Sequence, residues 1–443
     1  MLPTIRTDWL TAAIDKLATI SDAPAPAVTR ILFTPTELAG RAFIRQLARE
    51  LGLAIREDAL GNIFMRWEGA QPDLAAVATG SHIDAIPLSG KYDGVVGVIG
   101  ALEAIHALQE MGFQPQRSLE VIMFTAEEPT RFGLGCLGSR ALCGQLSAAD
   151  LRQLRDKDGR DLDSVRQEAG YKGDLASVAL PSGHYHAFVE LHIEQGPRLE
   201  RAGIALGVVS SIAAPATLRV LVAGEGGHAG AVLMPQRRDA LLAAAEIALA
   251  VERIALESLS PNAVATTGLF QVLPGAVNSI PSQVKLEIDM RDTHLETRDG
   301  MVTAVQAAIH EITQRRNTTA EVQLLNADPP AVCGAEVVAA VNKAAEQLHL
   351  SHMPLVSRAY HDALFMAQIC PTGMIFVPSK NGYSHRPEEY TSPEQIAHGV
   401  KTLALALAEL SLSASQPVSI SASQPVSESA RQLMERLENQ SVS

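Results

Sequence analysis

Residues 75–84 read AAVATGSHID, a short apolar run that gives way at once to glycine, serine, histidine and aspartate. Apolar runs bounded by turn residues are typical of buried strands, so we predict a strand at Ala75–Thr79. A helix rich in Val, Ile, Ala and Leu is predicted at Val95–Met111, and a second buried strand at Leu119–Thr125. This alternation of strand, helix and strand predicts an α/β fold with a mainly parallel central sheet.

The pattern changes in the middle of the chain. Thr217–Val222 and Gln283–Met290 alternate like half-buried antiparallel strands. Long helices are predicted at Asp239–Leu256 and Thr297–Arg316. We therefore expect a discontinuous catalytic domain formed by residues 1–208 and 327–412, with an α+β domain inserted at 209–326. Residues 413–443 contain SASQPVS twice and are expected to be a flexible tail.

Composition excludes several classes of protein. The chain has 443 residues, too many for one compact core, and a formal charge of −13. That charge argues against nucleic acid and anionic membranes as partners, because both attract positive surfaces. Residues 1–10 carry no apolar stretch behind a basic start, so we do not expect a signal peptide, and no apolar run is long enough to span a bilayer. Four cysteines without a CxxC pair suggest reduced, buried thiols, so we expect a cytoplasmic protein.

Candidate metal ligands follow the first predicted strand and begin the first predicted helix. His82 and Asp84 are two residues apart and face the same way on an extended segment, so Asp84 could fix the tautomer of His82. A solvated loop or an ordinary buried histidine would explain the pair as well. Asp93 precedes the helix, where a carboxylate suits the helix dipole. It either caps the helix or bridges two metal ions.

Two adjacent acids, Glu127 and Glu128, follow the second predicted strand. One could bind metal while the other moves protons, although an exposed acidic turn would look the same. His192 lies on another strand-like segment, and His385 lies in a loop after the predicted strand Met374–Pro378. Either histidine alone would suit a structural role. Together, three imidazoles and two carboxylates suit zinc, manganese, cobalt or nickel.

These segments, in this order, resemble the hydantoinase/carbamoylase family of dinuclear metal amidohydrolases, which share an aminopeptidase-like fold. The resemblance covers about nine-tenths of the chain and excludes the tail. Further matching segments are Asp58–Asn62, His228–Gly230, Arg237–Ala240, Pro274–Asn278 and Asp289–Asp292.

The resemblance implies a role for each matching residue. His82 and His192 would hold one divalent metal ion, Glu128 and His385 a second, and Asp93 would bridge them. Glu127 would be the general base, with Asp84 and His228 also catalytic. The implied substrate contacts are Gln195, His228, Asn278, Arg291, Tyr360 and His361. We expect Mn²⁺, with Zn²⁺, Co²⁺ or Ni²⁺ as alternatives. The inserted domain is expected to act as a lid and to form a homodimer.

One segment bears on the substrate. Many members of the family carry Ser-Gly-Ala-Gly-His-Asp-Ala, whereas this chain has Arg358 and Tyr360 in place of the two glycines. Tyr360 would shorten the pocket and add a hydroxyl, unless it only packs within its loop. The segment resembles ureidoglycolate amidohydrolases, which implies a role in allantoin degradation with glyoxylate, ammonia and carbon dioxide as products. The alternatives are an N-carbamoyl-L-amino-acid hydrolase, an allantoate amidohydrolase, or a non-catalytic binding protein.

Overall fold

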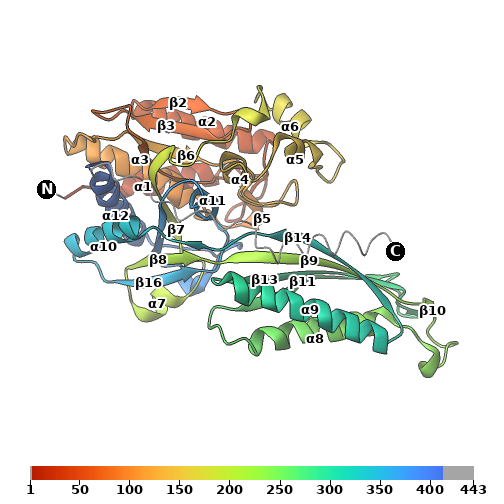
Figure 1. Cartoon of the computed structure of the whole chain (residues 1–443). Helices are drawn as coiled ribbons and strands as arrows, with labels where there is room; N and C mark the ends of the chain where they lie inside the picture. The colour runs from red at the N-terminus through yellow and green to blue at the C-terminus, as the bar shows by residue number, and fades with distance from the viewer. Residues whose placement is uncertain (1, 413–443) are drawn as a thin grey trace. The chain divides into compact units, whose positions relative to one another are not determined.

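The computed structural model describes residues 2–412, which form two compact units (Figure 1). The first unit contains residues 2–210, 332–357 and 361–412. The second contains Ser211–Ala331 and the three-residue segment Arg358–Tyr360. The chain therefore enters the second unit twice. The predicted tail at 413–443 lies outside the described residues.

The first unit is built on one large sheet with strand order β15-β8-β17-β7-β4-β6-β3-β2, and β16 also pairs with β8. Its central strands β17, β7, β4 and β6 are mutually parallel, whereas β8, β3 and β2 pair antiparallel. This confirms the mainly parallel central sheet. The strands are β2 Ala54–Glu57, β3 Ile63–Trp67, β4 Ala76–Ser81, β6 Leu119–Met123, β7 Tyr185–Ile193, β8 Leu206–Ile212, β15 Ala331–Val332, β16 His352–Ser357 and β17 Thr372–Val377. A separate pair joins β1 Val28–Arg30 to β5 Ala85–Ser89.

Helix α3, Val95–Glu110, is buried on nearly every face, as expected for a helix that is apolar all round. It packs closely on β7, because a Cβ added to Gly97 would lie 2.5 Å from the carbonyl oxygen of Leu191. Helix α2 is capped by Thr34, whose side chain accepts the Glu37 N–H at 3.2 Å. The other helices of this unit are α1 Thr7–Ala18, α2 Pro35–Glu50, α4 Leu137–Leu142, α5 Ala148–Gln153, α6 Leu162–Glu168, η1 Leu175–Ser177, α7 Arg198–Ala202, α10 Ala335–Gln347, α11 Asp362–Met366, η3 Lys380–Gly382 and α12 Pro393–Leu412.

The second unit is a four-stranded antiparallel sheet, β11-β13-β9-β14, with α8 and α9 packed on one face. Strands β9 and β13 alternate between buried and partly exposed residues, as predicted for Thr217–Val222 and Gln283–Met290. In β13 the buried residues are Val284, Leu286, Ile288, Met290 and Asp292. The elements are β9 Ala214–Ala223, β10 Gly227–His228, η2 Met234–Gln236, α8 Ala240–Leu256, β11 Val264–Leu273, β12 Ser279–Ile280, β13 Gln283–Asp292, α9 Leu295–Arg315 and β14 Thr319–Ala327.

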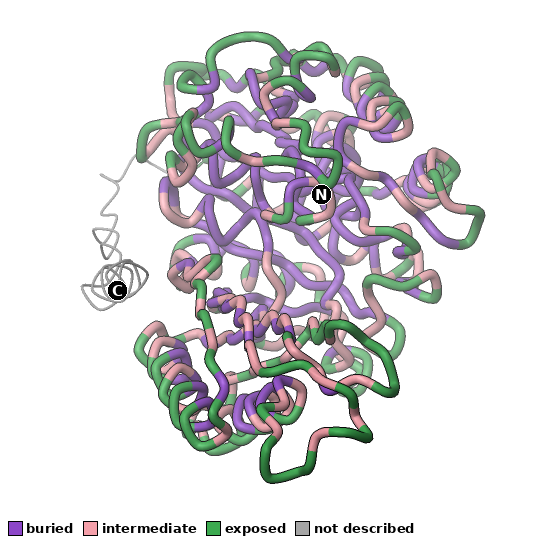
Figure 2. Tube along the Cα trace, turned by 90° about the vertical axis from the view of Figure 1, so that its right-hand side faces the viewer, coloured by how far each residue is buried: buried purple, intermediate pink, exposed green. Residues whose placement is uncertain are grey.

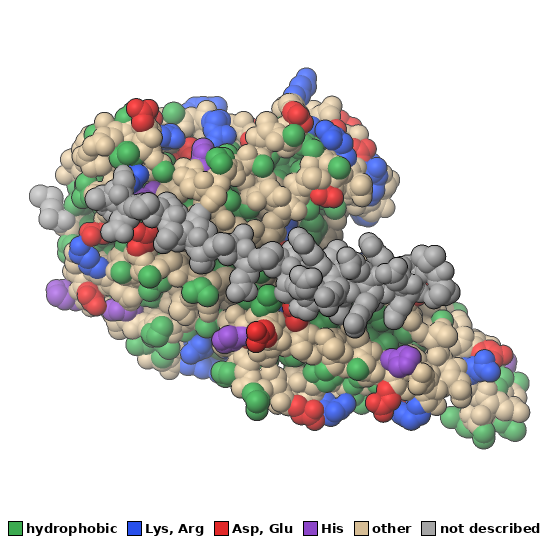
Figure 3. Space-filling view, viewed as in Figure 1, with side chains coloured by type: hydrophobic (Ala, Val, Ile, Leu, Met, Phe, Trp, Pro, Cys, Tyr) green, Lys and Arg blue, Asp and Glu red, His purple; other side chains and the backbone are tan. Residues whose placement is uncertain are grey.

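The two units differ in how much of their chain is buried. Figure 2 shows long buried stretches through the first unit and shorter, interrupted ones in the second. Hydrophobic and charged side chains are interspersed over the face shown in Figure 3. Among the helices described between residues 2 and 412, none has the length and apolar character required to cross a membrane.

Candidate dinuclear metal centre

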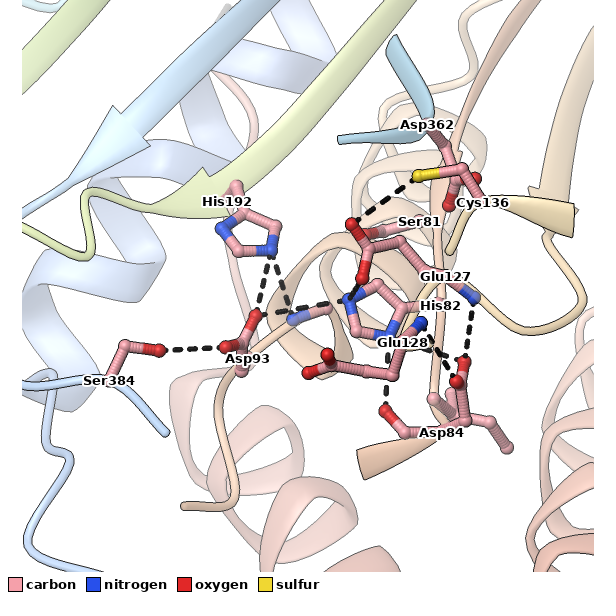
Figure 4. Close-up of polar contacts among 12 residues, drawn as sticks. Ser81, His82, Asp84, Asp93, Glu127, Glu128, Cys136, His192, Asp362 and Ser384 are labelled. Atoms are coloured by element: carbon pink, nitrogen blue, oxygen red, sulfur yellow. Dashed lines mark hydrogen bonds and ion pairs between the residues drawn. The ribbon is translucent and has the colours of Figure 1, made fainter. Parts of the chain in front are cut away.

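The carboxyl ends of four neighbouring parallel strands carry most of the candidate ligands. His82 follows β4, Glu127 and Glu128 follow β6, His192 lies near the end of β7, and His385 lies in the loops after β17. Parallel strands end at the same edge of a sheet, so these side chains meet there. Asp93 reaches the same edge from the segment before α3, and Figure 4 shows it between His192 and His82.

Two histidines present the same ring nitrogen to this edge. The Nδ1 of His82 lies 3.0 Å from the carbonyl oxygen of Asp84, and the Nδ1 of His192 lies 2.9 Å from that of Ile193. In each ring Nδ1 is therefore the donor, which leaves Nε2 as an acceptor. Metal-bound histidines are normally oriented by such a bond from the other ring nitrogen.

The two carboxylate oxygens of Asp93 contact different histidines. Its Oδ1 lies 3.1 Å from His192 Nε2 and 3.8 Å from His82 Nε2, while its Oδ2 lies 3.2 Å from His385 Nε2. The His385 Nε2 is also 3.3 Å from an oxygen of Glu128. Three groups of residues have ligand atoms close enough together to hold a metal ion, and one of them is Glu190, His192 and His361. The other two are His82, Asp93 and His192, and Asp93, Glu128 and His385. Asp93 belongs to both.

The contact between Asp93 and His192 needs a positive charge. With Nδ1 of His192 donating to Ile193, the neutral ring offers an acceptor to a carboxylate at 3.1 Å, so a proton or a metal cation must lie between them. Burial tends to raise the pKa of the Asp93 carboxyl, but hydrogen bonds from His192 and His385 outweigh burial and hold that pKa well below its usual range. Hydrogen bonds to Asp93 and Glu128 raise the pKa of His385 to about 11.

Gly94 makes room for this cluster. Its φ of 66° favours glycine, and an added Cβ would lie 2.4 Å from the His82 ring. Its N–H donates to His192 Nε2 at 3.1 Å. A side chain at this position would displace His82, so the glycine is a requirement of the site.

Glu127 is buried beside the cluster without a hydrogen bond to its histidines. Its Oε2 lies 3.7 Å from His82 Nε2, and its Oε1 lies 3.6 Å from Cys136 Sγ. Burial raises the pKa of its carboxyl well above the usual range, and the neighbouring His82 opposes that shift. Such a carboxyl group can both accept and return a proton.

Asp84 supports three residues at once. Its Oδ1 lies 3.4 Å from His82 Nδ1, which agrees with the predicted orientation of that ring. Its two oxygens also accept the backbone N–H groups of Glu127, at 3.3 Å, and Glu128, at 3.1 Å. Asp84 therefore holds the segment that carries both acids, and its contacts are with protein groups at the rim of the cluster.

Two predicted substrate contacts lie next to this centre. The ring of His361 is buried, with its centroid 4.5 Å from that of His192. Gln195 has a φ of 55° and donates from Nε2 to Asp93 Oδ2 at 2.8 Å. The amide of Gln195 therefore supports Asp93 in this structure.

The remaining predicted substrate residues belong to the second unit. His228 lies on β10, which pairs with β12, and the Ala229 N–H donates to the carbonyl of Asn278 at 2.8 Å. His228 and Asn278 are both exposed and come from adjoining segments. Arg291 lies on β13, with Nε 2.7 Å from Asp289 Oδ1.

The segment Arg358–Tyr360 is fixed to the second unit. Arg291 donates to the carbonyl of Arg358 at 2.8 Å, and Arg358 donates to Asn262 Oδ1 at 2.7 Å. The hydroxyl of Tyr360 donates to the carboxylate of Asp328. Asp328 was not among the predicted residues, because only the folded chain brings it to Tyr360.

The sequence analysis also missed polar residues around the cluster. Ser384 Oγ lies 2.7 Å from Asp93 Oδ2, and Glu389 accepts the Asp93 N–H at 3.1 Å. Glu190, two residues before His192, accepts from Ser81 Oγ at 2.8 Å and from Ala363 N at 3.0 Å. Ser384 adjoins the predicted ligand His385, and Glu190 is two residues from the predicted ligand His192. A polar residue this close in sequence to a predicted ligand was the available signal.

Comparison with known proteins identifies the family. The model of peptidase family M20/M25/M40 matches residues 78–409. Ureidoglycolate hydrolase of Oryza sativa subsp. japonica is 54% identical over 413 residues, 92% of this chain and 85% of the rice protein. The crystal structure of AtUAH in complex with (S)-hydroxyglycine superposes with a TM-score of 0.87 at 52% identity, covering 93% of this chain and 99% of that chain. AtUAH in complex with glyoxylate gives the same values.

A hydantoinase/carbamoylase family amidase from Burkholderia multivorans also matches, with a TM-score of 0.83, 34% identity and coverage of 93% of this chain and 99% of that chain. The chain therefore belongs to peptidase family M20/M25/M40, among its hydantoinase/carbamoylase amidases. This confirms the resemblance inferred from the motifs and makes the chain a hydrolase.

Proposed function

We propose that this chain hydrolyses the ureido C–N bond of ureidoglycolate. The observation that carries the proposal is the position of Asp93 between two ligand groups with Glu127 beside them, in a chain 54% identical to ureidoglycolate hydrolase. Water would split the bond to give carbamate and hydroxyglycine. Carbamate then releases carbon dioxide and ammonia, and hydroxyglycine releases glyoxylate and ammonia. (S)-Hydroxyglycine and glyoxylate are also the molecules bound in the AtUAH complexes.

The donor set fits two divalent metal ions, which this family generally binds. The first would be held by His82 and His192, the second by Glu128 and His385, and both by Asp93. Imidazole and carboxylate donors suit manganese, which we propose as the native metal, and also zinc, cobalt and nickel. When bound, such a pair lowers the pKa of a water toward neutrality and polarises the carbonyl.

Glu127 is the proposed general base and acid. Its oxygens face the cluster without a strong hydrogen bond, so the carboxylate is available to take a proton from water. Burial favours its neutral form, which would then return the proton to the leaving nitrogen. Asp84 has a supporting role, because it accepts the backbone N–H of Glu127 and contacts the ring of His82.

The remaining side chains are proposed to bind the substrate. Arg291 can form two hydrogen bonds to a substrate carboxylate. In this structure it forms them with Asp289, so the substrate would compete with Asp289 for Arg291. His228 could donate to the oxyanion that forms on the carbonyl. Gln195, Asn278 and His361 would contact polar groups of the substrate, and Tyr360 would limit the length of the pocket.

A homodimer formed by the second unit is proposed from its exposed apolar side chains. Leu242, Leu249 and Leu256 lie seven residues apart along α8 and are 41%, 64% and 79% exposed. Residues seven apart lie on one face of a helix, and an exposed apolar stripe of this kind is typical of an interface. The edge strand β11 has two more exposed apolar side chains, Val264 and Phe270. We propose a second copy of this chain as the partner.

Mixing two inactive variants tests the dimer and the role of His228 together. If His228 acts in the site of its partner, then Glu127→Gln mixed with His228→Ala should regain part of the activity that each lacks alone. An active monomer in light scattering, or no recovery after subunit exchange, would exclude the shared site.

The substrate is tested by a panel of assays on the manganese-loaded protein. Ureidoglycolate, allantoate, N-carbamoyl-L-amino acids and N-carbamoyl-β-alanine are compared by kcat/KM for ammonia release. Ureidoglycolate should be the best substrate. Preference for allantoate or a carbamoyl amino acid would overturn the proposed substrate, and no turnover of any ureide would favour a binding protein.

A further inference from the structure

Glu389 is a buried carboxylate in the loop between η3 and α12. Its side chain is 4% exposed, whereas the preceding Glu388 is 61% exposed and pairs with Arg386 at 2.9 Å. Just after Glu389, the loop is fastened to the segment that follows β17. Lys380 N–H donates to the carbonyl of Tyr390 at 2.9 Å, and Thr391 Oγ1 donates to that of Pro378 at 2.9 Å.

The two oxygens of Glu389 contact two distant parts of the chain. Oε1 accepts the backbone N–H groups of Tyr92, at 2.8 Å, and Asp93, at 3.1 Å. Oε2 lies 3.1 Å from Ser384 Oγ. Gly90 provides the space, because an added Cβ there would lie 2.4 Å from the Glu389 carboxylate.

Both contacted segments carry proposed metal ligands. Asp93 itself is the bridging residue, and Ser384 immediately precedes His385. Ser384 Oγ lies 2.7 Å from Asp93 Oδ2, the same oxygen that is 3.2 Å from His385 Nε2. Gln195 Nε2 completes the group, at 2.8 Å from that oxygen and 3.2 Å from Ser384 Oγ.

We propose that Glu389 is a positioning residue that fixes Asp93 and the Ser384–His385 segment to one another, so that both present ligand atoms to the same metal ion. The proposal rests on the proposed metal centre. His385 needs such support more than the other histidines, since its side chain is 48% exposed and its φ is 59°. His82 and His192 are buried and are held by backbone carbonyls instead.

The selective consequence concerns the second metal. Loss of Glu389 frees the loop that carries His385 but leaves the contacts of His82 and His192 with Asp84 and Ile193 in place. Groups that orient metal ligands typically contribute 10–100-fold to metal affinity. The affinity for the ion held by Glu128 and His385 should therefore fall by about that factor. The affinity for the ion held by His82 and His192 should fall by much less.

The test is a metal titration of metal-free Glu389→Ala, Glu389→Gln and the wild type, with Glu388→Gln as the matched control. Cobalt absorbance gives the two affinities, and the melting temperature is measured with and without metal. We expect Glu389→Ala to lower the affinity for one of the two ions by about 10–100-fold. Glu389→Gln should have a smaller effect, because its amide oxygen still accepts the N–H groups of Tyr92 and Asp93. Glu388→Gln should match the wild type.

A purely structural role predicts different data. It would lower the melting temperature of the metal-free protein, whereas a positioning role lowers mainly the gain in melting temperature on adding metal. Excess metal should restore kcat of Glu389→Gln with KM unchanged, because Glu389 does not touch the substrate. Two ions bound with wild-type affinity in both Glu389 variants would overturn the proposal, as would a wild type that binds fewer than two. A wild type that binds two ions but does not hydrolyse ureidoglycolate would overturn only the proposed substrate.

Discussion

The two units of this molecule show two ways of presenting functional residues. In the first unit every residue of β4 and β7 is buried, and His82 and His192, at the carboxyl ends of these strands, donate from Nδ1 to backbone carbonyls. In the second unit β13 buries every other residue, and His228 and Asn278 are exposed. A strand buried on both faces gives a rigid edge suited to metal ligands. The exposed residues His228 and Asn278 lie in and beside the separate β10–β12 pair, where they are accessible to a substrate or a partner.

Removal of metal should have the largest effect on activity, because the proposed chemistry depends on the ions held at the edge of the first unit's sheet. Exhaustive treatment with a chelator should abolish ammonia release from ureidoglycolate, and Mn²⁺ should restore it at least as well as Zn²⁺. Activity and metal content are measured on the same samples. Full activity in metal-free protein would contradict the proposed mechanism.

Glu127→Gln separates chemistry from metal binding at the same edge. The amide has nearly the shape of the carboxylate but cannot accept a proton from water, so kcat should fall by about 10²–10⁴-fold. Metal content should stay at two ions per chain, because Glu127 belongs to neither ligand group. Glu128→Gln is the matched control and should lose metal. Retained activity would show that another group is the base.

Tyr360→Gly tests the contribution of the second unit to specificity. It removes a hydroxyl and the packing of the ring, and a lost hydrogen bond to a charged group corresponds to roughly ten- to more than a hundred-fold in kcat/KM. We expect that loss on ureidoglycolate and unchanged or higher turnover of allantoate, because the variant gains only space. A parallel fall on both substrates would identify Tyr360 as a packing residue that Asp328 holds in place.

Glu246→Gln should have the smallest effect, and only on stability. Glu246 lies on α8, and its partners Arg315 and Arg316 lie at the C-terminal end of α9. Hydrogen bonds from Arg316 and Arg315 lower the pKa of Glu246 to about 2. A lowered pKa stabilises the fold above the usual pKa of a glutamate, and this stabilisation is lost as pH falls through about 4 toward 2. The variant should lose about 0.2–1 kcal/mol at pH 7, as for a partly exposed pair. Equal losses in denaturation at pH 7 and at pH 2 would contradict this assignment.

The sequence predicts the buried edge well, because a strand buried on both faces has a clear apolar pattern. The strand predicted at Ala75–Thr79 is Ala76–Ser81, and the helix predicted at Val95–Met111 ends one residue earlier, at Glu110. Helix α1, in contrast, begins at Thr7 with Arg6 as its N-cap, and Arg6 makes no side-chain capping bond. Such a helix start leaves little signal in the sequence.

Contacts between distant loops could not be predicted. Glu389 meets Tyr92 and Asp93 across 297 and 296 residues, and Asp328 meets Tyr360 across 32. Each pair depends on the folded backbone and on space left by residues such as Gly90. The roles of His228 and Asn278 came only from the family pattern, because exposed loop residues show no signal of their own.

The central claim, hydrolysis of the ureido bond, is tested most directly by the stoichiometry of the products. Manganese-loaded protein is incubated with ureidoglycolate, and glyoxylate, ammonia and urea are quantified, with Glu127→Gln as the control for spontaneous decay. Hydrolysis predicts two ammonia molecules for each glyoxylate and no urea above the control. One urea for each glyoxylate would mean that the other C–N bond breaks, and would contradict the account.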